Sequence, residues 1–323
     1  MGLSASERAK QQEETQFLER GVSLWQDAWH RLLRNRMAVA GLIFVGLLVF
    51  CALTADFLPP YSYRQADYEN TRIGPRWPDH IFGTDKLGRD VFTRVWWGTR
   101  VSLTVAVVGS LTSLVIGITY GLISGYSSVS VDNVMMRFVD FLYGFPILIF
   151  VILMQVYFKA VSRRGSSGVA AILINIDKAM GGLFFVFIAL GLLNWIGMAR
   201  IARGQTLSYK QKEFIEAARA VGAGNFRIIF RHLLPNILGP CIVAETLAIP
   251  GYISWEAFLS FIGLGVNPPV PSWGLMISET YQALRVAPHE CLVPGAFLAL
   301  TTLAFNFLGD GLRDAFDPRL RGT

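Results

Sequence analysis

Long blocks of apolar residues without a single charge dominate this chain, and short charged segments separate them. The block from Met37 to Ala55 and the block from Val101 to Ser130 are two examples. A helix rises about 1.5 Å per residue, so about 20 consecutive apolar residues cross the hydrocarbon core of a bilayer. The blocks therefore predict helices that span a membrane.

Six blocks are long enough, and they predict an all-α, polytopic membrane protein with six transmembrane helices. The predicted spans are residues 37–55, 101–126, 141–158, 181–198, 237–252 and 291–309. Only 16% of the residues are charged, against about 25% in a typical soluble domain. This composition excludes a disordered chain and a disulfide scaffold. The net charge of +6 indicates basic cytoplasmic loops and not binding of nucleic acid.

The first 36 residues are polar and precede an apolar block too long and too late for a signal peptide. We expect a cytoplasmic N-terminal segment, 1–36, followed by a permease domain, 37–323. Near its end, Val22, Trp25, Trp29, Leu32 and Leu33 predict an amphipathic helix that contacts membrane lipid, with a solvated tail as the alternative. Lys and Arg cluster before the first span and after the fourth, which predicts that both termini are cytoplasmic.

The sequence contains none of the motifs that indicate catalysis or nucleotide binding. No GxxxxGK[ST], HExxH, CxxC or GxSxG occurs, so we expect no enzyme activity and no cofactor in this chain. The three cysteines lie within apolar blocks and the four histidines share no ligand spacing. We therefore predict no metal site.

The segment between the fourth and fifth spans, residues 199–236, is too long and too patterned for a simple connection. Good helix formers run from Lys210 to Val221 and stop at Gly222. A second apolar stripe follows and ends at Pro235. The pattern predicts a short helix, a glycine turn and a second helix lying on the membrane.

Within this segment, Glu216-Ala217-Ala218 followed by Gly222, His232 and Pro235 resembles the EAA loop of permeases from ABC importers. In that family the short helix docks into a groove of the ATPase subunit. The resemblance implies an ATPase-coupling site, which we list as Glu213, Glu216, Ala217, Ala218, Gly222, His232 and Pro235. Small residues allow close approach of another chain, and a glutamate can pair with a basic residue there.

Two further stretches resemble the peptide-type permeases of this family. Phe82-Gly-Thr-Asp-Lys-Leu-Gly-Arg-Asp90 is similar to their FGTDxxGRD signature, and the segment from Leu259 to Gly274 is similar to their LSFLGLG…PxxSWG segment. Near the N-terminus of the chain, Ser-Leu-Trp-Gln-Asp-Ala resembles the C-type permease of oligopeptide importers in particular, and so does the C-terminal segment.

This resemblance implies a multi-pass protein of the bacterial cytoplasmic membrane that forms half of a pathway for oligopeptides. It implies a second permease, two ATPase subunits that bind ATP and Mg, and an extracytoplasmic binding protein. Alternative cargoes are dipeptides, nickel chelates and peptide antibiotics. A secondary transporter driven by an ion gradient is the alternative class.

Several charged residues could act in transport or only in folding. Glu245 is the only charged residue well inside a predicted span, so it either lines the pathway or a subunit contact, or pairs with a neighbouring helix. Glu256, at the outer end of the fifth span, is a second candidate for the pathway or a subunit contact, although we expect it rather to fix the following segment. The outer signature comprises Gly83, Thr84, Asp85, Gly88, Arg89 and Asp90, which we expect to form a tight turn rather than a docking site. The long loop 159–180 is either an amphipathic helix at the outer surface or an insertion without function.

Overall fold

The computed structural model describes residues 24–144, 146–164 and 168–317. Residues 1–23, which hold most of the predicted N-terminal segment, lie outside them. The described part of the chain is helical and contains no β-strand. Its helices, in order, are α2 (Leu24–Arg34), α3 (Arg36–Leu53), α4 (Val91–Thr112), α5 (Ile118–Tyr126), α6 (Val129–Gly144), α7 (Ile147–Arg164), α8 (Gly168–Ala179), α9 (Phe184–Lys210), α10 (Glu213–Ala220), α11 (Asn225–Arg227), α12 (Leu234–Phe261), α13 (Trp273–Thr280) and α14 (Pro288–Phe316). Two π-helical segments, η1 (Ser113–Gly117) and η2 (Ile228–Leu233), and one 3-10 turn, η3 (Tyr281–Ala283), complete them.

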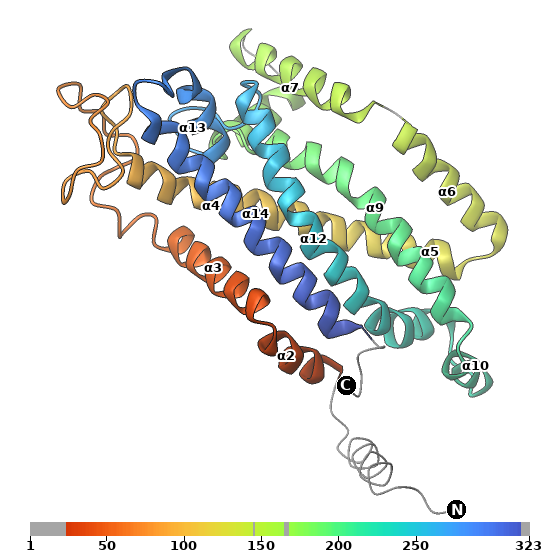
Figure 1. Cartoon of the computed structure of the whole chain (residues 1–323). Helices are drawn as coiled ribbons and strands as arrows, with labels where there is room; N and C mark the ends of the chain where they lie inside the picture. The colour runs from red at the N-terminus through yellow and green to blue at the C-terminus, as the bar shows by residue number, and fades with distance from the viewer. Residues whose placement is uncertain (1–23, 145, 165–167, 318–323) are drawn as a thin grey trace, which may run out of the picture.

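The long helices form a bundle with two distinct ends (Figure 1). At one end lie α2, α10 and the C-terminal end of α14; we call it the α10 end. At the other lie α13 and the extended segment 54–90; we call it the α13 end. Helices distant in sequence pack side by side, with α3 against α14, α12 against α14, and α5 against α9.

Four helices in the described residues are long and apolar enough to cross a membrane, and a fifth is added if one bent pair counts as a single span. The four are Arg36–Leu53, Val91–Tyr126, Asn225–Phe261 and Pro288–Phe316. Each of the last three extends beyond its predicted span. The second predicted span began at residue 101, yet its helix begins ten residues earlier and includes Arg94 and Arg100. Both arginines are paired within the chain, so a charge marks the edge of an apolar block and not the end of a helix.

The third predicted span, residues 141–158, is not one straight helix. It is divided between α6 and α7, which meet at an angle of 69°. Pro146 lies between them. Proline lacks a backbone N–H and disfavours helical conformation in the residue before it, which accounts for the break. The prediction of a single helix here was wrong.

The described residues of the predicted loop 159–180 are mostly helical. Helix α7 continues to Arg164, and α8 runs from Gly168 to Ala179. A turn then leads to α9, where Gly181 and Gly182 both have positive φ. Helices are present in the described part of this segment, while its place at the outer surface and its function stay predictions.

The second helix of the predicted 199–236 segment does not lie separately on the membrane. Helix α11, segment η2 and α12 form one helix from Asn225 to Phe261, and Pro235 stands in the first turn of α12 without ending it. A proline is tolerated in a first turn, and π-helical turns accommodate an interrupted hydrogen-bond ladder. The first residues of the segment, 199–210, belong to α9. Only α10 is a separate helix.

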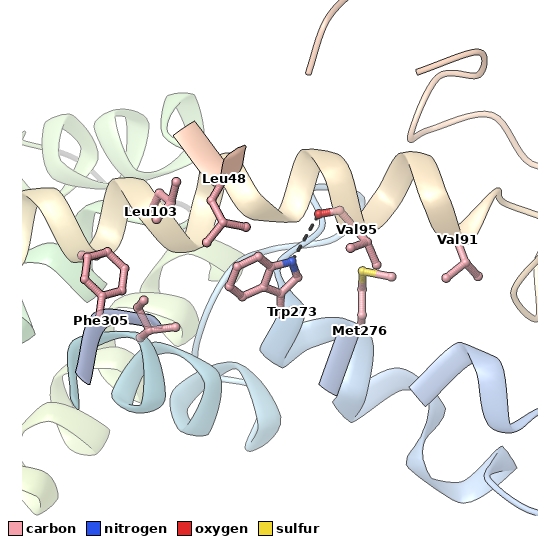
Figure 2. Close-up of a cluster of buried hydrophobic side chains, with 9 residues drawn as sticks. Leu48, Val91, Val95, Leu103, Trp273, Met276 and Phe305 are labelled. Atoms are coloured by element: carbon pink, nitrogen blue, oxygen red, sulfur yellow. Dashed lines mark hydrogen bonds between the residues drawn. The ribbon is translucent and has the colours of Figure 1, made fainter. Parts of the chain in front are cut away.

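The core near the α13 end centres on Trp273, which is fully buried (Figure 2). Its indole N–H donates a hydrogen bond to the carbonyl of Val95 in α4, at 3.2 Å. Met276 of the same helix, Leu48 of α3 and Phe305 of α14 belong to the same buried cluster. This cluster therefore joins α3, α4, α13 and α14.

Close packing of α5 against α9 determines where α10 lies. Gly121 of α5 faces Ala199 and Ala202 of α9 so closely that an added Cβ would overlap with both. Small residues of this kind let two helix backbones approach. Because α9 leads directly to α10, this contact sets the base on which α10 rests.

Candidate functional site

Helix α10 is a short amphipathic helix that stands at the end of the bundle. Ile215 is completely buried, in a cluster with Ile118 and Leu122 of α5 and Ile228 and Leu233 of η2. One apolar side chain thus anchors the helix.

The remaining face of α10 is open. Glu213, Glu216 and Ala217 are exposed, and Ala218 is half-buried. Two carboxylates beside small alanines form a surface on which the backbone of another chain could approach closely.

The glycine turn after α10 depends on backbone conformation and not on space. Gly222 has φ +88°, and a side chain at this position would meet nothing within 4 Å. Its N–H bonds the carbonyl of Arg219 at 2.9 Å, and the N–H of Ala223 bonds that of Ala218 at 3.0 Å. Glycine adopts positive φ at little cost, so it reverses the chain here.

The predicted coupling residues belong to two successive helical elements. His232 lies in η2 and is half-buried, and its carbonyl accepts a hydrogen bond from Asn236 at 2.6 Å. Pro235 is exposed in the first turn of α12. Glu213, Glu216, Ala217, Ala218 and Gly222 are contiguous in α10 and its turn, whereas His232 and Pro235 belong to the helix that follows.

The signature residues 83–90 form a compact turn at the α13 end. Asp85 is buried and its carboxylate accepts hydrogen bonds from the backbone N–H groups of Leu87 and Arg89, at 2.8 and 3.0 Å. It also pairs with the side chains of Arg89 and Arg94. Both arginines reach Glu279 of α13 as well, at 3.2 and 3.0 Å.

Two opposing effects act on the pKa of Asp85. Burial alone would raise it, but the charges of Arg94 and Arg89 and the two backbone N–H groups outweigh burial and hold the pKa below its ordinary value. The carboxylate is therefore ionised and ties the 83–90 turn to α4.

Asp90 and Thr84 fix the rest of the turn. Asp90 caps the N-terminus of α4 by accepting from the N–H of Thr93 at 2.7 Å, and its other oxygen lies 2.9 Å from Nδ1 of His80. The hydroxyl of Thr84 donates to the carbonyl of Asn70. Gly88 has φ +70°, and a side chain there would collide with the carbonyl of Asp67. Beside this turn lies a cavity of about 250 Å³, lined in part by Asp67, His80 and Asp90.

Sequence reasoning missed Arg94 and Glu279. Arg94 seemed to be one more loop charge, yet it is among the largest fully buried side chains. Glu279 lies 185 residues further along the chain. The one signal in the sequence was the position of Arg94, six residues after the signature glycine Gly88. Nothing local indicated that Glu279 is its partner.

Glu245 and Glu256 are both buried and hydrogen-bonded within the chain. Glu245 accepts from the hydroxyl of Ser113 in η1 at 2.9 Å and from that of Tyr252 at 2.6 Å. Glu256 accepts from Ser260 at 2.7 Å. Hydroxyl groups thus donate hydrogen bonds to both carboxyl groups, and partners of this kind accommodate a polar group at membrane depth.

Two ion pairs join α6 to α9. Asp132 of α6 pairs with Arg203 of α9 at 2.6 Å, and Asp140 pairs with Arg200 at 2.7 Å. Within the described residues, no group of three or more His, Cys, Asp or Glu is arranged to hold a metal ion.

Comparison with known families assigns the class. The model for binding-protein-dependent transport system inner membrane components matches residues 117–322, and the model for the N-terminal domain of oligopeptide transport permease C matches residues 23–75. The chain therefore belongs to the family of binding-protein-dependent transport system inner membrane components. More particularly, it is a permease subunit of an ABC importer.

Individual relatives agree over nearly the whole chain. The oligopeptide transport system permease protein OppC of Haemophilus influenzae is 42% identical over 93% of this chain and 90% of its own. The dipeptide transport system permease protein DppC of Bacillus subtilis is 42% identical over 93% of this chain and 87% of its own. The glutathione transport system permease protein GsiD of Pectobacterium atrosepticum is 39% identical over 92% of each.

Among solved structures, one chain of the MetNI methionine ABC transporter, in an inward facing conformation, is similar in fold. Its TM-score is 0.51 at 18% identity, over 70% of this chain and 96% of that chain. At this identity the likeness concerns the fold alone.

Proposed function

We propose that this permease carries oligopeptides through half of a translocation pathway and that α10 is its coupling helix, which docks on an ATPase subunit. The observation that carries the proposal is the geometry of α10. A single buried residue, Ile215, anchors it, while Glu213, Glu216 and Ala217 remain exposed beside a glycine turn. A surface of this kind, at the end of a long helix that enters the bundle, suits the transfer of a rigid-body movement.

The proposed topology has six spans, with both termini in the cytoplasm. It is supported by the position of α2 and of the end of α14 at the α10 end (Figure 1). We assign residues 1–36 to a cytoplasmic segment and 37–323 to the permease domain. In α2, Leu32 is buried against the end of α14, so part of the predicted apolar stripe packs against protein instead of lipid. Trp29 and Leu33 remain exposed, and we assign them to the lipid headgroup layer.

The proposed partners are a second permease, two ATPase subunits and an extracytoplasmic peptide-binding protein. ATP and Mg would bind to the ATPase subunits, since this sequence lacks a phosphate-binding loop. Oligopeptides are the proposed cargo because the model for the N-terminal domain of oligopeptide transport permease C matches residues 23–75, and OppC proteins of Haemophilus influenzae and Escherichia coli are among the relatives at 42% identity. Dipeptides remain the alternative cargo, since DppC of Bacillus subtilis matches at the same identity. We propose that the 83–90 turn serves folding rather than docking, because its charged side chains form ion pairs within the chain.

Purification of the tagged chain from its native membrane in mild detergent tests the proposal. We expect a second permease and ATPase subunits to co-purify, with ATP hydrolysis in the same sample. Replacing Glu216 by Lys should remove the ATPase subunits and leave the second permease. Recovery of the chain alone, with peptide uptake driven by an ion gradient after reconstitution, would replace the proposal with a secondary transporter.

Cargo is tested with the reconstituted importer and its binding protein. Uptake of a labelled pentapeptide should be reduced by excess unlabelled peptides of three to five residues and not by a nickel chelate. The reverse pattern of competition would reject oligopeptides as the cargo.

A further inference from the structure

The connection between α9 and α10 does not by itself fix the direction of α10. Only Gln211 and Lys212 separate the two helices, and no side chain caps the N-terminus of α10. A helix of eight residues is also too short to be stable alone. Its orientation therefore depends on tertiary contacts.

Tyr126, the last residue of α5, supplies several of these contacts. Its hydroxyl donates a hydrogen bond to the side-chain oxygen of Asn225, at 2.8 Å, at the start of α11. The guanidinium of Arg219, in the last turn of α10, lies 5.7 Å from the centre of its ring. One aromatic side chain thus contacts both α10 and the helix that follows the glycine turn.

Lys210, the last residue of α9, attaches to the same place. Its ammonium group donates to the carbonyls of Gly125, Tyr126 and Ser127 at 3.3, 2.9 and 3.2 Å. It also lies 5.5 Å from the centre of the Tyr126 ring. The last carbonyls of a helix lack partners in the helix itself, and a cation is favourable at this end of the helix dipole. The end of α5 is thereby bound to the end of α9.

A third contact lies about two turns before Lys210 along α9. Arg203 of α9 donates two hydrogen bonds of 2.6 Å to Asp132 of α6, and Ser124 of α5 donates to the same carboxylate. Bidentate charge-assisted pairs of this geometry are strong and directional. Helices α5, α9 and the start of α6 are therefore joined immediately beneath α10.

We propose that Tyr126 and Lys210 are positioning residues that fasten the coupling helix to the inner end of α5, so that α10, α5 and the end of α9 move as one unit. The proposal rests on the proposed function of α10. Movement imposed on α10 is then transmitted to the bundle, and flexing of the two-residue connection before α10 does not absorb it.

Hydrogen exchange of the chain alone, in lipid nanodiscs, tests the fastening independently of any partner. In Tyr126→Leu we expect the amides of residues 213–223 to exchange about tenfold faster, which corresponds to about 1.4 kcal/mol. Tyr126→Phe, which loses only the bond to Asn225, should show a smaller increase. Tyr143→Leu is the matched control, because Arg200 lies 4.5 Å from the centre of that ring and Tyr143 belongs to α6. Unchanged exchange in Tyr126→Leu, or an equal change in the control, would overturn the fastening.

Coupling is then tested in the assembled transporter, in proteoliposomes with the binding protein. Tyr126→Leu and Lys210→Met should retain the ATPase subunits and hydrolyse ATP, while the ATP consumed per peptide transported rises about tenfold. Lys210→Arg, which can still donate to the carbonyls, should restore most of the coupling.

An unchanged ratio of ATP to peptide, despite faster exchange in α10, would overturn the positioning role. Absence of ATPase subunits from the wild-type sample would instead reject the proposed function and leave the result of the exchange experiment standing.

Discussion

At the scale of single residues, buried charges in this chain are satisfied by partners that fold next to them. Asp85 and Glu245 illustrate two ways. Asp85 is held by two arginines and two backbone N–H groups, and Glu245 by the hydroxyls of Ser113 and Tyr252. Both arrangements reduce the cost of removing a carboxylate from water.

Asp85→Asn should destabilise the protein in a way that depends on pH. Because the pKa of Asp85 is held below its ordinary value, its contribution to the free energy of unfolding is present above about pH 4 and is lost as the pH falls through the lowered pKa. We expect a loss of about 3 kcal/mol at neutral pH that shrinks below pH 4. The measurement is the unfolding midpoint in detergent against pH, and a loss that stays constant down to pH 3 would contradict it.

Gly222→Leu should impair uptake without affecting membrane insertion. The turn requires φ +88°, which costs a residue with a Cβ about 1–2 kcal/mol, so the turn after α10 would change. Gly224→Leu is the control, since it lies in the same turn region, has equally open space and has φ −69°. Uptake in vesicles is the measurement. Equal uptake by the two variants would show that the turn conformation does not matter for coupling.

At the scale of elements, helix ends were set by tertiary contacts and by proline, not by charge. Helix α9 continues past Arg200 and Arg203, because both are paired with acids of α6. Helices α6 and α7 are separated at Pro146 inside an apolar block. An uncharged stretch therefore indicates where a helix can enter the membrane, while its ends depend on what the flanking side chains meet.

Gly121→Leu should separate α5 from α9. A side chain there would overlap with Ala199 and Ala202, and overpacking of this kind costs about 1–3 kcal/mol. We expect the unfolding midpoint in detergent to fall by about 5 °C. Gly46→Leu, in α3 and with nothing within 4 Å of its added Cβ, should leave the midpoint unchanged. Equal stability of the two variants would argue against the tight contact between α5 and α9.

At the scale of the whole molecule, the arrangement separates two tasks. At the α13 end the 83–90 turn and the Trp273 cluster are packed into the protein. At the α10 end a short helix is exposed. A closed α13 end and an exposed helix at the α10 end fit the proposed role of α10 as the contact with an ATPase subunit.

The isolated chain should not hydrolyse ATP. The sequence contains no phosphate-binding loop, so activity should appear only in samples that contain the co-purifying subunits. The measurement is phosphate release by the chain after the partners have been removed by a high-salt wash, with the intact complex as the positive control. Hydrolysis that follows this chain through the wash would contradict the prediction.

The sequence by itself determined the class of protein, because hydropathy and local motifs are properties of neighbouring residues. Uncharged blocks of about 20 residues indicated helices in a membrane, and Glu216-Ala217-Ala218 with Gly222 indicated a short helix and its turn. These features need no information about distant parts of the chain. The family comparison confirmed the class of permease that they suggested.

Tertiary structure alone decided which residues meet. The partners Arg94 and Glu279 are 185 residues apart, and Tyr126 reaches Asn225 across 99. Their pairing follows from how the helices pack, since a side chain's partners depend on the approach of whole elements and not on sequence spacing. The same packing extended α4 beyond its uncharged block and placed Lys210 on the end of α5. The attachment of α10 is therefore a property of the folded bundle.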